Sequence, residues 1–398
     1  MQPQEYIDIE AKWGAHNYHP LPVVIEKAKG VWVWDVAGKR YMDFLSAYSA
    51  VSQGHLHPHV IGEVKAQLDK LTLTSRAFHN DRLGPFLERL CQLAGMEMAL
   101  PMNTGAEAVE TAIKMARRYA HTKMGIPAER GDIVVCDNNF HGRTTTIVGF
   151  SSDPGSRDGF GPFTPGFTSI PFNDLDAFQE AIGDDTIGIL VEPIQAEAGI
   201  YPPDPGYLRG LRDVCDDRGI LLMFDEIQTG LCRTGRMFAF QHEDAKPDIL
   251  TVGKAIGAGV IPLSAAISSR EIMSVFTPGS HGSTFGGNPL ACAVGEAAID
   301  VLVDERLDER AARLGKHTME RLEEMRTPAV KEVRGMGMLI GIEMVLGEGE
   351  TVRPHCERLM ELGLLCKDTH ERTIRLAPPL TITEEELDWA LERLAQVL

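Results

Sequence analysis

Short apolar runs alternate with amphipathic stretches through the middle of the chain. The apolar runs are rich in Val, Ile and Leu and are bounded by Gly, Pro or Asp, as is typical of buried parallel strands. They cover 131–136, 186–192, 220–226, 248–253 and 263–269. Between them, the spacing of apolar residues predicts helices over 106–120, 174–182 and 206–219. This alternation predicts an α/β fold whose large domain has a mostly parallel, doubly wound sheet.

The pattern changes after about Pro289. A long helical stretch over 289–326 precedes strands at 337–345 and 374–379, with helices over 352–362 and 383–396. Thr383 and Glu386 match a capping box for the last helix. Residues 31–44 are typical of a hairpin that turns at 35–38. We therefore expect three parts: an N-terminal segment 1–48 packing with a small domain, a large domain 49–294, and a smaller α+β domain 295–398.

Composition narrows the class of protein. The chain has 398 residues, 43% of them hydrophobic, and 57 acidic against 39 basic residues give a net charge of −18. This acidic balance argues against nucleic acid or an anionic membrane surface as a partner. No apolar run approaches the ~18 residues of a membrane span. Seven widely spaced cysteines without a CxxC motif, and an N-terminus without a leader pattern, predict a cytoplasmic location.

Two chemically informative residues follow predicted strands. Asp225 ends the run 220–224, and Lys254 follows the run 248–253. Open α/β sheets bind ligands at the carboxyl ends of their strands. A lysine that forms a Schiff base, with a carboxylate that keeps a pyridine nitrogen protonated, is what pyridoxal phosphate requires. Alone, Asp225 could be a helix N-cap and Lys254 a solvated lysine, but the pair favours the cofactor site.

A phosphate group needs backbone N–H donors. Thr104, Gly105 and Ala106 open a predicted helix whose first amides can hold an anion. Thr104 with Glu107 also matches a capping box, so ordinary capping is an equal alternative. A second Gly-rich turn offers the Thr284 hydroxyl, which by itself indicates only a loop.

Other side chains suit ring and carboxylate recognition. Phe140 follows a strand and can stack on a planar ring, while Arg143 and Arg375 can pair with carboxylates. For any single arginine, a surface salt bridge is the commoner role. The histidines of 55–59 do not favour a metal site, because Pro58 interrupts the strand pattern and no Cys or carboxylate partner has ligand-like spacing.

Taken together, the motifs resemble the class III, fold type I pyridoxal-phosphate aminotransferases over nearly the whole chain. The segments that carry the resemblance are 14–23, 45–55, 71–78, 102–112, 191–200, 224–236, 281–290 and 367–379. The segments NYHP (17–20) and SAYSAV (46–51) are similar to those of the ornithine δ-aminotransferase branch of this family. The resemblance implies a fold of a large cofactor-binding domain and a small domain, and transfer of the δ-amino group of ornithine to 2-oxoglutarate. The products would be glutamate and glutamate 5-semialdehyde, which cyclises to pyrroline-5-carboxylate.

The resemblance also implies a homodimer or larger homo-oligomer with shared active sites. N-acetylornithine and 4-aminobutyrate aminotransferases share the core motifs and remain alternatives. So do an intramolecular aminomutase and a protein without enzymatic activity.

Residue roles follow from the same resemblance. Lys254 would bond to the cofactor and move the substrate proton, Asp225 would pair with the ring nitrogen, Gln228 would contact the phenolic oxygen, and Phe140 would stack on the ring. The phosphate would be held by Thr104, Gly105, Ala106 and Ser283, and by Thr284 of the partner subunit.

The substrate residues are implied in the same way. Arg143 would take the α-carboxylate of ornithine and Tyr18 its α-amino end, while Tyr48 would shape the pocket. Glu197 would pair with Arg375 and release it when 2-oxoglutarate arrives. Two positions call for comment: Ala196 stands where the family commonly has Gly, which could restrict the movement of Glu197, and His141 carries no assigned role.

Overall fold

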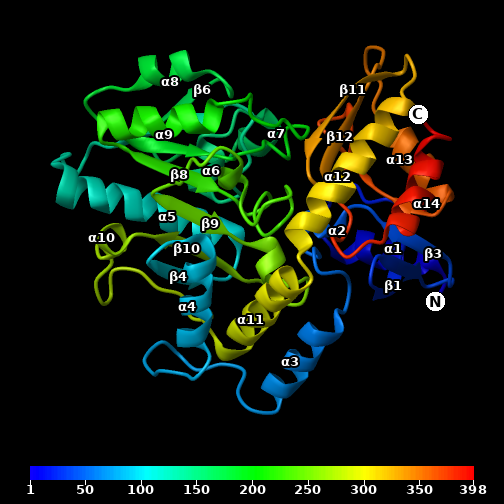
Figure 1. The fold of residues 1–398 in the computed structure, drawn as a ribbon, viewed down its shortest axis with the longest axis horizontal. Coiled ribbons are helices and arrows are strands. Elements are labelled where there is room, and N and C mark those ends of the chain that lie inside the picture. The colour runs from blue at the N-terminus through cyan, green and yellow to red at the C-terminus, as the bar shows by residue number, and fades with distance from the viewer.

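A seven-stranded sheet forms the centre of the computed structural model, which describes all 398 residues (Figure 1). The strand order is β4-β10-β9-β8-β7-β5-β6. The strands are β4 (Met98–Met102), β5 (Asp132–Cys136), β6 (Phe167–Ile170), β7 (Thr186–Val191), β8 (Leu221–Asp225), β9 (Ile249–Val252) and β10 (Ser264–Ser268). All five predicted strands are present, and the mostly parallel sheet is confirmed. The parallel direction expected for β10 is wrong, because β10 runs antiparallel to both β9 and β4.

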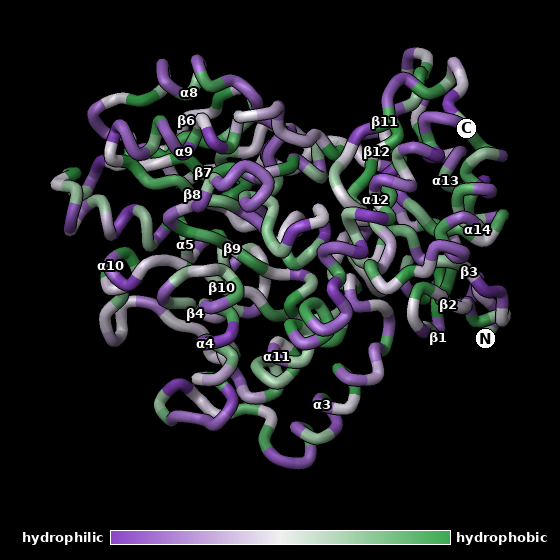
Figure 2. Tube along the Cα trace, viewed as in Figure 1, coloured by the Kyte–Doolittle hydropathy of each residue, from purple (hydrophilic) through white to green (hydrophobic).

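Both faces of this sheet are buried. Along β8, Leu222 and Phe224 join one apolar cluster, while Leu221 and Met223 join the other. One face is covered by α5 (Gly105–Tyr119), α6 (Thr145–Gly149) and α10 (Arg270–Met273). The other is covered by α4 (Leu83–Ala94), α8 (Leu175–Ala181), α9 (Tyr207–Arg218) and α11 (Pro289–Asp304). Burial on both faces explains the unbroken apolar runs in the sequence, which appear as green segments through β7, β8 and β9 (Figure 2).

A smaller antiparallel sheet lies in the C-terminal part, in the order β11-β12-β15-β14. Its strands are β11 (Val330–Met336), β12 (Leu339–Met344), β14 (Lys367–Thr369) and β15 (Thr373–Leu376), and its helices are α12 (Leu307–Glu324), α13 (Arg353–Glu361) and α14 (Glu384–Leu394). The capping box of Thr383 and Glu386 is confirmed. The single helical stretch over 289–326 is wrong in detail, because Arg306 adopts a left-handed φ of 51° and separates α11 from α12.

The N-terminal region joins the C-terminal region in a third sheet, β1-β2-β3-β13. It contains β1 (Ile25–Lys29), β2 (Trp32–Asp35), β3 (Arg40–Asp43) and β13 (Leu364–Leu365), and β2 with β3 forms the expected hairpin. In Figure 1 the blue N-terminal strands accordingly lie beside the red C-terminal helices. The domain limits at 48 and 294 stay predictions.

The remaining helical segments are short or peripheral. They are α1 (Pro3–Trp13), α2 (Ser46–Ser49), α3 (Pro58–Leu68), α7 (Pro154–Arg157), η1 (Ala120–Met124), η2 (Ala239–His242) and η3 (Lys254–Gly257). The helix α1 buries none of its residues. None of the helices combines the length and the apolar character that a membrane crossing demands. The histidines of 55–59 each face a carboxylate: His55 pairs with Asp43, His57 with Glu305 and His59 with Asp300.

Candidate active site

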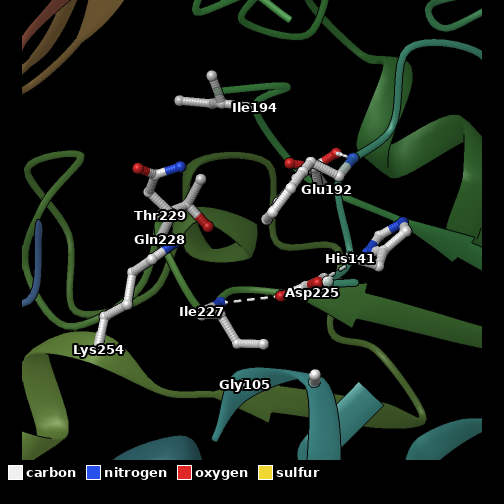
Figure 3. Close-up of a pocket in the computed structure, with 12 residues that line it drawn as sticks. Gly105, His141, Glu192, Ile194, Asp225, Ile227, Gln228, Thr229 and Lys254 are labelled. Atoms are coloured by element: carbon white, nitrogen blue, oxygen red, sulfur yellow. Dashed lines mark hydrogen bonds and ion pairs between the residues drawn. The ribbon is translucent and has the colours of Figure 1, made fainter. Parts of the chain in front are cut away.

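The carboxyl ends of the central strands surround a cavity of about 200 Å³ (Figure 3). Lys254, Asp225, Gln228 and Phe140 all contribute to its wall, and so does the start of α5 at 105–106. The sequence patterns placed these residues after strands, and the parallel strands carry their ends to one edge of the sheet. The structure therefore brings together the inner part of the predicted site.

Lys254 is the first residue of η3, directly after β9. Its backbone has a φ of 48°, a left-handed conformation that is unfavourable for a residue with a side chain. Burial lowers the pKa of the Lys254 amine, and Arg375 adds to the effect, while Glu197 and Asp225 oppose it. A lowered pKa increases the neutral fraction of the amine, which is the nucleophilic form.

Asp225 lies at the end of β8 with both carboxylate oxygens bonded. Oδ2 is 2.7 Å from Nδ1 of His141, and Oδ1 accepts the backbone N–H of Ile227 at 3.1 Å (Figure 3). The hydroxyl of Thr251 also donates to Oδ1, at 3.3 Å. Burial acts to lower the pKa of His141, but the hydrogen bond and charge of Asp225 raise it overall. His141 thus orients Asp225, a role that the sequence did not reveal.

Glu192, directly after β7, is a second residue missed in the sequence. It accepts the backbone N–H of Phe140 at 2.9 Å and so fixes the loop that carries the aromatic ring. Burial raises the pKa of Glu192 to about 8. The available signal was a carboxylate at the end of an apolar strand, the same pattern that singled out Asp225.

The start of α5 has both a capping box and backbone N–H groups that can bind a phosphate. Thr104 and Glu107 form the capping box, and the Glu107 carboxylate also accepts the N–H of Asn103. The N–H groups of Gly105 and Ala106 have no acceptor within the chain, so they are free to bind an anion. A Cβ atom on Gly105 would lie 3.0 Å from Cδ1 of Ile227, which explains the need for glycine.

Ser283 and Thr284 lie on the loop before α11. The Ser283 hydroxyl accepts from Nδ2 of Asn103 at 2.9 Å and from the backbone of Gly286 at 3.0 Å, and so braces the approach to α5. Thr284 is exposed and does not line the cavity of its own chain. Its predicted contact with the partner subunit's cofactor stays a prediction.

Glu197 and Arg375 form the predicted ion pair. Oε1 of Glu197 lies 2.7 Å from Nη1 of Arg375, whose residue is 1% exposed. Burial acts to raise the pKa of Glu197, but Arg375 outweighs it and lowers the pKa to about 2. Arg375 also donates to the Thr369 hydroxyl at 3.0 Å and to the Ala196 carbonyl at 3.3 Å. The Ala196 side chain packs in a small apolar cluster, so the extra methyl does not prevent the pair.

Tyr48 projects from a strained turn. All four residues of α2, 46–49, have left-handed φ values, between 42° and 74°, and none is glycine. Such backbone costs about 1–2 kcal/mol per residue. Asp43 stabilises the turn by accepting the N–H groups of Leu45 and Ser46, at 2.9 and 2.8 Å. The result places the Tyr48 ring 5.2 Å from the guanidinium of Arg375.

Tyr18 and Arg143 lie further out. They share a cavity of about 550 Å³, separate from the one at Lys254, and Tyr18 is 74% exposed. The guanidinium of Arg143 is 5.2 Å from the Phe140 ring. A smaller cavity has Phe140, Arg143 and Glu197 in its wall. The two outer residues are therefore beside the inner site but not in it.

The family model for class III aminotransferases matches residues 13–398. The chain therefore belongs to the class III aminotransferases, which use pyridoxal 5'-phosphate. The site fits this cofactor: the Lys254 amine has a lowered pKa, Asp225 is buried, two amides of α5 are free, and Oε1 of Gln228 is buried without a partner.

Several named proteins of this family are similar to the chain over nearly its whole length. The chain is 56% identical to the ornithine aminotransferase of Brevibacillus brevis over 98% of this chain and 97% of the relative. It is 53% identical to that of Macrococcus caseolyticus over 99% and 98%. The ornithine aminotransferase structure from Toxoplasma gondii superposes with a TM-score of 0.98 at 44% identity, covering 100% and 94%. An acetylornithine aminotransferase from Elizabethkingia anophelis has a TM-score of 0.91 at 45% identity, covering 100% and 99%.

Proposed function

We propose that this protein is an L-ornithine:2-oxoacid 5-aminotransferase. It moves the δ-amino group of ornithine to 2-oxoglutarate, which gives glutamate and glutamate 5-semialdehyde, and the semialdehyde cyclises to pyrroline-5-carboxylate. The observation that carries the proposal is the pair of Glu197 with Arg375 beside Lys254, in a chain 53–56% identical to named ornithine aminotransferases.

The pair has a direct chemical consequence. One pocket must accept the cationic δ-amino end of ornithine and later the dianion 2-oxoglutarate. While Glu197 neutralises Arg375, the ammonium group meets no net positive charge there. When Glu197 moves away, Arg375 becomes a bidentate partner for a carboxylate. Arg375 also donates to the neutral oxygens of Thr369 and Ala196, and neither of these hydrogen bonds involves Glu197.

The inner residues supply the chemistry of the reacting carbon. When bound, the cofactor supplies a ring that accepts electrons from that carbon. Asp225, oriented by His141, would pair with the ring nitrogen, Phe140 would hold the face of the ring, and Gln228 would hold its phenolic oxygen. Lys254 holds the cofactor between reactions and moves the proton of the substrate δ-carbon, for which a neutral amine is required.

The remaining residues bind the ends of the ligands. The free amides of Gly105 and Ala106, with Thr104, Ser283 and Thr284 of the partner subunit, hold the phosphate. Arg143 takes the α-carboxylate of ornithine, Tyr18 its α-amino end, and Tyr48 closes the side of the pocket next to Arg375. In the homodimer that we propose, Thr284, which is exposed in its own chain, would reach the site of the partner subunit.

A second candidate is N-acetylornithine aminotransferase, favoured by the 45% identity to the protein of that name. The test supplies the purified holoenzyme and 2-oxoglutarate with ornithine, N-acetylornithine or 4-aminobutyrate in turn. We expect kcat/KM for ornithine to exceed the other two at least tenfold. Equal or better turnover of N-acetylornithine would overturn the assignment to ornithine.

A further inference from the structure

Lys367 lies on the same face of the small-domain sheet as Arg375. The two residues are cross-strand partners, on β14 and β15, so their side chains point to one side of the sheet. The Lys367 ammonium donates to the Tyr48 hydroxyl at 3.2 Å. It also lies 5.8 Å from the ring centroid of Tyr48 and 5.8 Å from that of Tyr18. Lys367 therefore stands between the two tyrosines expected to contact substrate.

Arg375 has a carboxylate partner, and Lys367 has none. Glu197 neutralises Arg375 at 2.7 Å, whereas no carboxylate of the chain lies within 4.0 Å of the Lys367 ammonium. Its only hydrogen-bond acceptor is the neutral phenol of Tyr48. This partly buried ammonium therefore has a phenol and two ring faces as its partners, and no carboxylate in contact with it.

Arg143 also lies near Tyr18. It shares a cavity wall with Tyr18, whose ring Lys367 approaches from β14. A ligand that places its reacting amine at Lys254 and extends toward Tyr18 therefore approaches two cations at its far end, and Asp153 and Asp368 line the same outer cavities as Arg143. Of these four residues, only Arg143 and Lys367 can pair with a carboxylate.

We propose that Lys367 is a specificity-determining residue, which recognises the carboxylate at the end of the substrate remote from the reacting amine and so disfavours diamines, which lack that carboxylate. The proposal rests on the proposed function, since it takes the δ-amine of ornithine as the reacting group. It adds a substrate class that the site excludes, namely α,ω-diamines that lack a carboxylate.

Three probes separate the charges at the far end. Ornithine has both a carboxylate and an ammonium there, 5-aminopentanoate has only the carboxylate, and 1,4-diaminobutane has only the ammonium. A fourth probe, pentanoate, has no amine and cannot react, so its dissociation constant from the holoenzyme is measured by calorimetry. The variants are Lys367→Met, which removes the charge at similar length, and Lys367→Arg, which keeps it. Lys316→Met on exposed α12 is the matched control.

For Lys367→Met we expect KM for ornithine and 5-aminopentanoate, and the dissociation constant of pentanoate, to rise about tenfold, with kcat within about twofold of wild type. The KM for 1,4-diaminobutane should stay constant or fall. Lys367→Arg should restore carboxylate binding, and Lys316→Met should match wild type.

Equal losses for all probes, or unchanged pentanoate binding in Lys367→Met, would overturn the proposal. A purely structural role, such as holding Tyr48, predicts the equal losses. If wild type fails to use ornithine, the proposed function fails, while the pentanoate measurement still tests Lys367 independently.

Discussion

Replacing Glu197 by alanine tests the pairing on which the substrate assignment depends. Glu197 is the one carboxylate within ion-pair distance of Arg375, at 2.7 Å, and the other acceptors of this guanidinium are a hydroxyl and a carbonyl. The substitution therefore leaves a nearly buried arginine with an uncompensated charge. That charge faces the region of Lys254, because Arg375 contributes to the lowered pKa of the lysine.

The size of the effect follows from Coulomb's law. For an arginine charge about 6 Å from the entering ammonium, at an effective dielectric constant of about 20, the repulsion is about 2.8 kcal/mol. This corresponds to a loss of about 100-fold in kcat/KM for ornithine. Glutamate as amino donor brings a carboxylate instead, so it should gain by up to a similar factor. The preference for ornithine over glutamate should fall by about 10²- to 10⁴-fold.

Single-turnover absorbance changes of the cofactor measure the two half-reactions separately. Glu197→Gln removes the charge but retains a hydrogen-bond acceptor, so it should show the same direction of change. Glu180→Ala, at an exposed position on α8, controls for the substitution itself. The reasoning is refuted if Glu197→Ala folds, binds cofactor, and keeps the wild-type preference for ornithine over glutamate.

Three further predictions concern the inner site, the strained turn and pH. Lys254→Ala should lower turnover by at least about 10³-fold, and borohydride reduction should leave no cofactor adduct in its mass spectrum, whereas an adduct elsewhere would contradict the assignment. Asp43→Ala removes the side-chain oxygen that accepts two backbone N–H groups of the left-handed turn, and it should lower the free energy of urea unfolding by about 1–3 kcal/mol. A variant with unchanged urea stability and unaltered KM would count against the turn's role. Arg375 lowers the pKa of Glu197 from 4.5 to about 2. The contribution of this ion pair to the free energy of unfolding is therefore complete above about pH 4.5 and is lost as the pH falls toward 2. The stability difference between wild type and Glu197→Gln should therefore be constant from pH 6 to 5 and shrink below pH 4.5, and a difference that grows on acidification would contradict the sign.

The inner site was predictable because its pattern is local. A strand buried on both faces reads as an unbroken apolar run, and parallel strands bring the residues after such runs to one edge. Asp225 and Lys254 follow from that rule alone. The direction of β10 did not follow, because an apolar run has the same pattern in either direction. Nor did the end of α11, where Arg306 adopts a left-handed conformation without a glycine to indicate it.

The remaining contacts of both the inner and the outer site join segments that the sequence pattern does not connect. His141 meets Asp225, and Lys367 meets Tyr48, only after the sheets have formed, and no spacing rule joins positions so far apart. Residue type alone suggested nothing for either one, since a single histidine or lysine has many ordinary roles.

The turn at 46–49 shows why the substrate end of the site resists prediction from local rules. Four consecutive residues without a glycine are not expected to adopt left-handed backbone, so local preference and final structure disagree there. The fold compensates with the Asp43 acceptors and with the bond from the Ser46 hydroxyl to the Ala377 carbonyl, which ties the turn to the end of β15. Because β15 also carries Arg375, the bond from Ser46 fixes the position of Tyr48 relative to the Glu197–Arg375 ion pair. Contacts between distant segments thus maintain strained backbone at this position, as is common beside functional sites.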